Sequence, residues 1–159
     1  MFNFLKKDPK TTFHAVASGT LLPLSQVNDQ VFSTKMLGDG FAVEPTNGEI
    51  FAPVKGKIIS VFPTKHAISV LTKSGLEILI HMGIDTVELA GKPFEILVSE
   101  GQEVSPTTQL AKMDLAELAK TNTPATTIVV VTNMEIVKNI DAVTEQAVTA
   151  SEEVLTVEV

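Results

Sequence analysis

Residues 76–86 read LEILIHMGIDT: an apolar run of strand length, a histidine, and then a glycine that interrupts the pattern. Leucine and isoleucine over this length predict a β-strand, and Gly83 predicts a turn shortly after His81. A histidine at the lip of a turn can present its imidazole to a partner, whereas a histidine in mid-core does not. A second histidine, His66, precedes the neighbouring apolar run at 67–71. We expect the two imidazoles to form one site.

Short apolar runs rich in Ile, Val, Phe and Thr recur on both sides of this stretch, and Gly, Pro, Asn or Asp separate them. They lie at 19–24, 51–54, 56–62, 67–71, 76–80, 94–98, 127–132 and 153–159. Many short strands with short connections predict an all-β fold, either an antiparallel β-sandwich or a closed barrel. We expect one or two very short helices, one capped by Asp114 and a weaker one within 30–36.

Length and hydropathy limit the domain organisation and the location. The 159 residues suffice for one domain with a core, and we expect a flexible N-terminal tail at 1–12 and a single domain at 13–159. No apolar run approaches the length of a membrane span, about 20 residues, and nothing reads as a signal peptide. We therefore expect a cytoplasmic protein, with at most weak peripheral membrane contact through the N-terminus.

The charged residues exclude several classes of function. The net charge of −7 argues against a nucleic-acid partner and favours a protein partner with a basic face. The absence of cysteine excludes disulfides, thiolate nucleophiles and Cys-based zinc sites. All 12 basic residues are lysine, so no guanidinium can clamp a phosphate from two sides.

Two registers of the hairpin around residues 72–75 stay open at this point. A two-residue turn places His66 directly opposite His81, close enough for the rings to touch. A three-residue loop with Gly75 in the left-handed conformation slips the register by one residue, which sends regular strand side chains to opposite faces. The slipped register gathers the branched apolar residues on one face, and a bulge could restore the ring contact.

If the rings meet, their chemistry suits phosphoryl transfer. A neutral imidazole nitrogen of His81 is a nucleophile toward phosphorus when a backbone carbonyl, which the Gly83 region can offer, holds its other nitrogen. His66 can then donate to a phosphoryl oxygen, and Thr64 can steady that ring or the phosphate. Asp85 can repel excess phosphate charge or pair with a cation of a partner.

An apolar patch with an acidic rim is expected around these residues, as suits a transient basic partner. The patch comprises Val31, Phe32, Met36, Leu37, Phe62, Leu79 and Val87, with Asp29 and Asp85 at its rim.

The chain resembles the glucose-family enzyme IIA of the bacterial phosphoenolpyruvate-dependent sugar phosphotransferase system, from about Ser18 to Val159. The resemblance rests on GDGFAVEP at 38–45, APVKG at 52–56, TKHA at 64–67, HMGIDTVEL at 81–89, EGQEV at 100–104 and VVTNM at 130–134. The histidine motif with its flanks is the specific part.

The resemblance implies a β-sandwich and a phosphoryl carrier without a cofactor. It implies that His81 accepts a phosphoryl group from the phosphohistidine of the small carrier HPr and passes it to a cysteine of a sugar-specific enzyme IIB domain. His66 would stabilise the phosphoryl group with support from Thr64, and the apolar patch would dock both partners. It also favours the two-residue hairpin register and, with Met1 and the short tail, a free-standing protein.

Further partners follow from the same resemblance. Regulated transporters or metabolic enzymes are candidates, and relatives can bind zinc between two proteins through the residues that match His66 and His81. Two other classes of protein stay open. The sequence APVKG at 52–56 and Lys112 suggest a biotinyl- or lipoyl-type carrier domain, and the histidines suggest a zinc metallohydrolase, although two are fewer than the usual four ligands.

Overall fold

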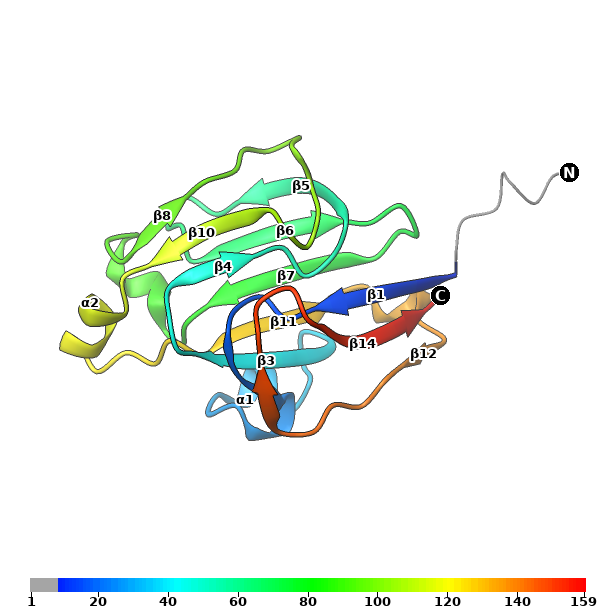
Figure 1. Cartoon of the computed structure of the whole chain (residues 1–159), viewed down its shortest axis with the longest axis horizontal. Coiled ribbons are helices and arrows are strands. Elements are labelled where there is room, and N and C mark those ends of the chain that lie inside the picture. Colours follow the sequence, from blue (N-terminus) through cyan, green and yellow to red (C-terminus); the bar gives the residue numbers. More distant parts are fainter. Residues whose placement is uncertain (1–8) are drawn as a thin grey trace, which may run out of the picture.

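The computed structural model describes residues 9–159. In this part of the chain the strands pair antiparallel in three sheets, of which the largest has the order β13-β2-β3-β11-β7-β6-β5-β9 (Figure 1). The strands of the large sheet are β2 (Gly19–Pro23), β3 (Asp39–Pro45), β5 (Gly56–Val61), β6 (Ala67–Leu71), β7 (Glu77–Met82), β9 (Glu103–Val104), β11 (Thr127–Val131) and β13 (Gln146–Val148).

Two three-stranded sheets complete the β structure. One has the order β1-β14-β12, with β1 (Lys10–His14), β14 (Glu153–Glu158) and β12 (Asn139–Ile140). The other has the order β4-β10-β8, with β4 (Glu49–Phe51), β10 (Gln109–Met113) and β8 (Phe94–Ile96). This architecture confirms the predicted all-β antiparallel sandwich.

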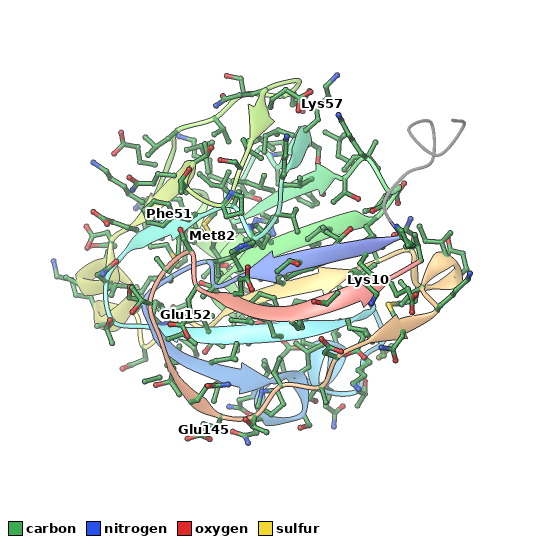
Figure 2. All side chains as sticks on the ribbon, turned by 45° about the vertical axis from the view of Figure 1, so that its right-hand side comes forward. Lys10, Phe51, Lys57, Met82, Glu145 and Glu152 are labelled. Atoms are coloured by element: carbon green, nitrogen blue, oxygen red, sulfur yellow. The ribbon has the colours of Figure 1, made fainter. Side chains whose placement is uncertain are left out.

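The main core lies between one face of the large sheet and the two small sheets. Ile78, Ile80 and Met82 alternate inward along β7 and are at most 1% exposed. Phe13 of β1 and Leu110 of β10 belong to the same buried cluster. Figure 2 shows Met82 near the middle of the molecule, with Lys57 and Glu145 at opposite edges.

The opposite face of the large sheet carries a second, smaller cluster. It consists of Leu24, Val27, Phe32, Ala42, Ile84, Ile128 and Val130. The short helices η2 (Leu24–Gln26) and α1 (Gln30–Ser33) cover this part of the sheet. The central strand β11 is therefore buried on both faces, which explains its unbroken apolar run from Ile128 to Val131.

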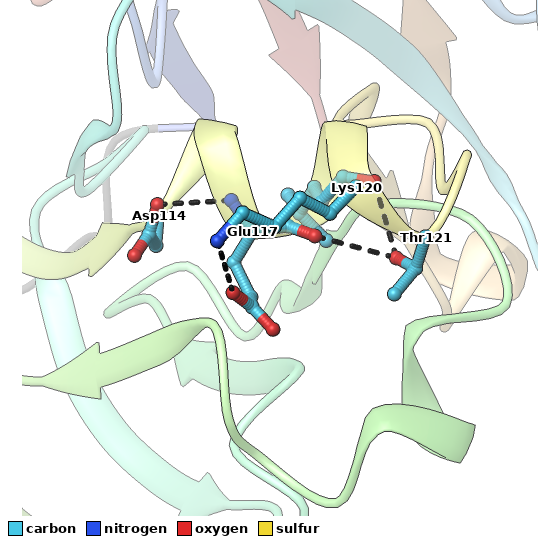
Figure 3. Close-up of polar contacts among 5 residues, drawn as sticks. Asp114, Glu117, Lys120 and Thr121 are labelled. Atoms are coloured by element: carbon cyan, nitrogen blue, oxygen red, sulfur yellow. Dashed lines mark hydrogen bonds and ion pairs between the residues drawn. The ribbon is translucent and has the colours of Figure 1, made fainter.

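The two predicted helical segments are both short. α1 covers residues 30–33 of the expected 30–36. α2 (Leu115–Lys120) begins after Asp114, whose Oδ1 accepts a hydrogen bond from the N–H of Glu117 at 3.0 Å, as the sequence predicted (Figure 3). In the described part of the chain, the other helical turns are η3 (Thr86–Leu89) and η4 (Met134–Ile136). Within residues 9–159, no helix is long and apolar enough to cross a membrane.

The expected tail and hairpin register both need correction. Residues 10–12 belong to β1, which pairs with β14, while residues 1–8 lie outside the described part of the chain. In the β6–β7 hairpin Ala67 pairs with His81, so the favoured two-residue register is wrong and the alternative holds. The observed register arises because Gly75, with a φ of +96°, allows the longer, three-residue loop.

Candidate functional site

The outer end of β7 brings both histidines together. His81 points to the face of the sheet opposite the main core, because its neighbours Ile80 and Met82 point inward. The ring centroids of His66 and His81 are 5.0 Å apart, with the ring planes at 75°. The expected pairing of the imidazoles therefore occurs, although the register that was expected to produce it does not.

The contact arises because His66 is not a strand residue. It lies in the loop between β5 and β6, where the N–H of Phe62 donates to the carbonyl of Ala67 at 3.0 Å. Lys65 has a φ of +61°, in the left-handed region, so the chain turns just before His66. A loop side chain does not follow strand alternation, and the ring of His66 can reach His81 from a position that strand geometry would forbid.

The hydrogen bond of His81 defines its protonation pattern. Nδ1 of His81 lies 2.8 Å from the carbonyl oxygen of Gly83. A carbonyl can only accept, so Nδ1 carries the hydrogen, and in the neutral ring Nε2 keeps its lone pair. Gly83 itself has a φ of +77°, which favours glycine at this position.

Thr64 holds the second imidazole. Its Oγ1 lies 2.6 Å from Nδ1 of His66, a buried residue that is 7% exposed. Phe62 packs edge-on against His66, with ring centroids 5.5 Å apart. Phe32 of α1 lies against His81 at 5.1 Å. Each imidazole therefore has one polar anchor and one aromatic neighbour.

Burial lowers the pKa of both histidines. For His66 desolvation is the cause. For His81 desolvation is the largest cause, and the nearby ring of His66 lowers the pKa further. The hydrogen bond to Gly83 and the carboxylates of Asp29 and Asp85 act in the opposite direction without overcoming burial. Both rings are thus biased toward the neutral form, which is the nucleophilic form of imidazole.

Comparison with known proteins identifies the family. Residues 11–137 match the model of a family described as phosphoenolpyruvate-dependent sugar phosphotransferase system, EIIA 1. The chain belongs to this enzyme IIA family. The solved structure of glucose permease IIA from Mycoplasma capricolum is similar, with a TM-score of 0.85 and 39% identity over 96% of this chain and 97% of that one.

A longer relative is also similar to this enzyme IIA domain. The chain is 47% identical over 134 residues to the PTS system glucose-specific EIICBA component of Streptococcus pneumoniae serotype 4. The match covers 84% of this chain but 18% of the length of that relative. The chain therefore spans less than a fifth of the length of that relative.

The predicted docking residues of the enzyme IIA domain fall into two groups. Five are exposed on the surface: Val31, Met36, Leu37, Phe62 and Val87, with exposed fractions from 38% to 74%. Phe32 and Leu79 are not, because Phe32 belongs to the second core cluster and Leu79 packs against that cluster.

The acidic residues of the predicted rim have backbone roles as well. Asp29 caps α1, since its Oδ1 accepts from the N–H of Val31 at 2.9 Å. Asp85 precedes η3 in the left-handed conformation, with a φ of +60°. Among residues 9–159, no cluster of three or more His, Cys, Asp or Glu side chains could hold a metal ion.

Sequence reasoning missed two residues that hold the turn after β7 through hydrogen bonds. Thr86 is fully buried, and its Oγ1 donates to the carbonyl oxygen of Met82 at 2.6 Å. Pro124 accepts from the N–H of Ile84 at 3.1 Å. The Asp-Thr pair after Gly83 was visible as part of the histidine motif, but no periodicity indicated that Thr86 turns back toward β7.

Proposed function

We propose that this enzyme IIA domain, expected at 13–159, carries a phosphoryl group on Nε2 of His81. It accepts the group from the phosphohistidine of HPr and passes it to a cysteine of a sugar-specific enzyme IIB domain in the cytoplasm. The observation that carries this proposal is the 2.8 Å hydrogen bond from Nδ1 of His81 to the carbonyl of Gly83. It leaves the Nε2 lone pair as the nucleophile beside a second imidazole.

The proposed transfer balances without a proton moving on His81. A bond forms between Nε2 and phosphorus while the bond from phosphorus to the HPr imidazole breaks. In the second step a thiolate sulfur of enzyme IIB bonds to phosphorus, and the bond to Nε2 breaks. The hydrogen stays on Nδ1 and continues to donate to the Gly83 carbonyl throughout, so His81 returns to its starting tautomer.

His66 is proposed as the stabiliser of the phosphoryl group. When the Thr64 hydroxyl donates to Nδ1 of His66, the remaining hydrogen of the neutral ring is on Nε2. That N–H can donate to a phosphoryl oxygen on His81, whose ring is 5.0 Å away. Such a neutral donor can stabilise developing charge in a partly buried site.

The surroundings of His81 support docking of a protein. The exposed apolar residues define a patch, hereafter the docking patch: Val31, Met36, Leu37, Phe62 and Val87. The negative net charge and the carboxylates of Asp29 and Asp85 fit a basic partner surface around that patch. No deep cavity is needed, because both partners bring the phosphoryl donor or acceptor on their own surface.

The test uses phosphoenolpyruvate, enzyme I and HPr. We expect an acid-labile, base-stable phosphoryl adduct on the protein, and we expect His81→Ala to abolish it. His66→Ala should still accept the group but pass it poorly to enzyme IIB. The third histidine, His14, supplies the matched control, and His14→Gln should accept and pass the group normally. An adduct on His81→Ala, or its absence from the parent protein, would overturn the proposal.

A further inference from the structure

The turn that follows β7 is restrained at successive peptide groups. The N–H of Met82 donates to the carbonyl of His66 at 2.7 Å. The carbonyl of Met82 accepts from Oγ1 of Thr86 at 2.6 Å. The N–H of Ile84 donates to the carbonyl of Pro124 at 3.1 Å. Two of these three restraints are bonds between backbone atoms, so Thr86 is the one that a side-chain substitution can remove.

The last restrained peptide group is the one that holds His81. The carbonyl of Gly83 and the N–H of Ile84 belong to the same planar unit, so they move together. His81 and Pro124 bind opposite ends of that unit, at 2.8 and 3.1 Å. Because Gly83 has no Cβ, its own φ and ψ preferences restrict the backbone less than those of any other residue would. The orientation of its carbonyl therefore depends on the groups packed around it.

Thr86 restrains this turn with both branches of its side chain. It is fully buried. Its Cγ2 occupies the space beside Gly83, only 2.4 Å from where a Cβ on Gly83 would lie. Its Oγ1 fixes the carbonyl of Met82, which belongs to the peptide group immediately before Gly83. The methyl therefore packs beside Gly83, while the hydroxyl holds the peptide group that precedes it.

We propose that Thr86 is a positioning residue that sets the tautomer of His81. Through Met82 and Gly83 it keeps the hydrogen on Nδ1 and the lone pair on Nε2, where phosphoryl transfer requires it. Its effect on transfer rests on the proposed function of His81, but its effect on the tautomer does not. Without the Thr86 hydroxyl, the turn relaxes, the Gly83 carbonyl no longer meets the ring, and the other tautomer becomes populated.

The test compares Thr86→Val with Thr86→Ser. Valine keeps the shape of threonine and removes the hydroxyl, whereas serine keeps the hydroxyl. Nitrogen-15 NMR of the unphosphorylated protein reports which ring nitrogen of His81 carries the hydrogen. In Thr86→Val we expect the Nε2–H form to be detectable and the rate of phosphorylation by phospho-HPr to fall about ten-fold, as displaced reacting groups cause. In Thr86→Ser the tautomer of His81 should match that of the parent protein. The rate of phosphorylation should stay within about two-fold of the parent rate.

Thr72 provides the control for a purely structural role. It is a buried threonine at the other end of the β6–β7 hairpin, and its Oγ1 accepts from the N–H of Leu76 at 3.0 Å. Thr72→Val should lower stability but leave the tautomer of His81 and the rate unchanged. The inference fails if folded Thr86→Val keeps the parent tautomer and rate, if Thr72→Val shows the same changes, or if folded Thr86→Ser loses the parent tautomer.

These outcomes separate the inference from the proposed function. If the parent protein takes no phosphoryl group on His81, the proposed function fails, while the tautomers of the Thr86 variants still decide whether Thr86 positions the ring. If Thr86→Val does not fold, folded Thr86→Ser decides: parent behaviour supports the hydroxyl as the restraint, and a changed tautomer overturns it.

Discussion

Gly83→Ala perturbs the turn that holds His81, and its cost can be worked out from the structure. At a φ of +77° an L-residue loses about 1–2 kcal/mol relative to glycine. The new Cβ would also lie 2.4 Å from Cγ2 of Thr86 and 2.9 Å from the carbonyl oxygen of Pro124. Because both neighbours are packed, we add an overpacking cost of about 1–3 kcal/mol. The free energy of unfolding should fall by about 2–5 kcal/mol in total.

Gly75→Ala separates the two parts of that cost. Gly75 has a φ of +96°, but the nearest atom to a Cβ there is Cδ1 of Ile136 at 3.6 Å, an ordinary contact. This variant should lose only the conformational part, about 1–2 kcal/mol. Urea unfolding of both variants, with equal m-values, gives the difference directly. Phosphorylation by phospho-HPr should slow in Gly83→Ala alone, since only that variant moves the carbonyl that holds His81.

Equal destabilisation of the two variants would contradict this prediction. It would mean that Thr86 and Pro124 yield without cost and that the turn is not tightly packed. Parent-like phosphorylation of a strongly destabilised Gly83→Ala would refute a different step, namely that the Gly83 carbonyl governs the nucleophile.

Two further predictions concern pH and docking. Burial holds the pKa of both histidines below 6.5 in the folded protein, so the unfolded state binds more protons as the pH falls through 6.5. The free energy of unfolding should therefore fall as the pH drops from 6.5 to the folded pKa values, and level off below them. Urea unfolding at each pH measures this fall, and His81→Gln should reduce it. An unchanged fall in His81→Gln would contradict the lowered pKa of His81. In the docking patch, Val87→Lys places a charge on a half-exposed apolar residue and should raise the KM for phospho-HPr about ten-fold with little change in stability. Ile136→Lys, at the far end of the β6–β7 hairpin, is the matched control, and an equal rise in its KM would show that the effect is not local.

The sequence predicted the strands better than it predicted their pairing. β6 has the predicted limits, and β7 differs from prediction by one or two residues at its ends, because alternation of apolar residues reports burial directly. β3 and β10 were not predicted, although both pair within sheets. Register depends on loop geometry, and the φ of Gly75 decided between two alternatives that residue types left open.

For the site, too, the sequence predicted which residue types take part but not the backbone geometry that brings them together. The histidine pair, Thr64 and the acidic residues were visible as residue types at suggestive positions. The left-handed conformation of Lys65, which brings His66 to His81, was not visible, because lysine carries no preference for it. Phe32 was predicted to lie on the surface, but it is buried where α1 covers one face of the large sheet. A helix of four residues is too short to leave a periodic pattern in the sequence that would predict this burial.

The charge distribution around His81 suits a group that is held briefly. The chain contains no arginine, so no guanidinium can clamp a phosphoryl group on His81, and the side chain beside that ring is the neutral donor His66. The carboxylates of Asp29 and Asp85 lie near enough to raise the pKa of His81, and the same field would repel a dianionic phosphoryl group. A site with strong cationic clamps would hold the group too tightly to release it to a thiolate. For the proposed relay, neutral donors and opposing carboxylates therefore keep the energies of the carrier and its partners close, so that docking of enzyme IIB decides when the group leaves.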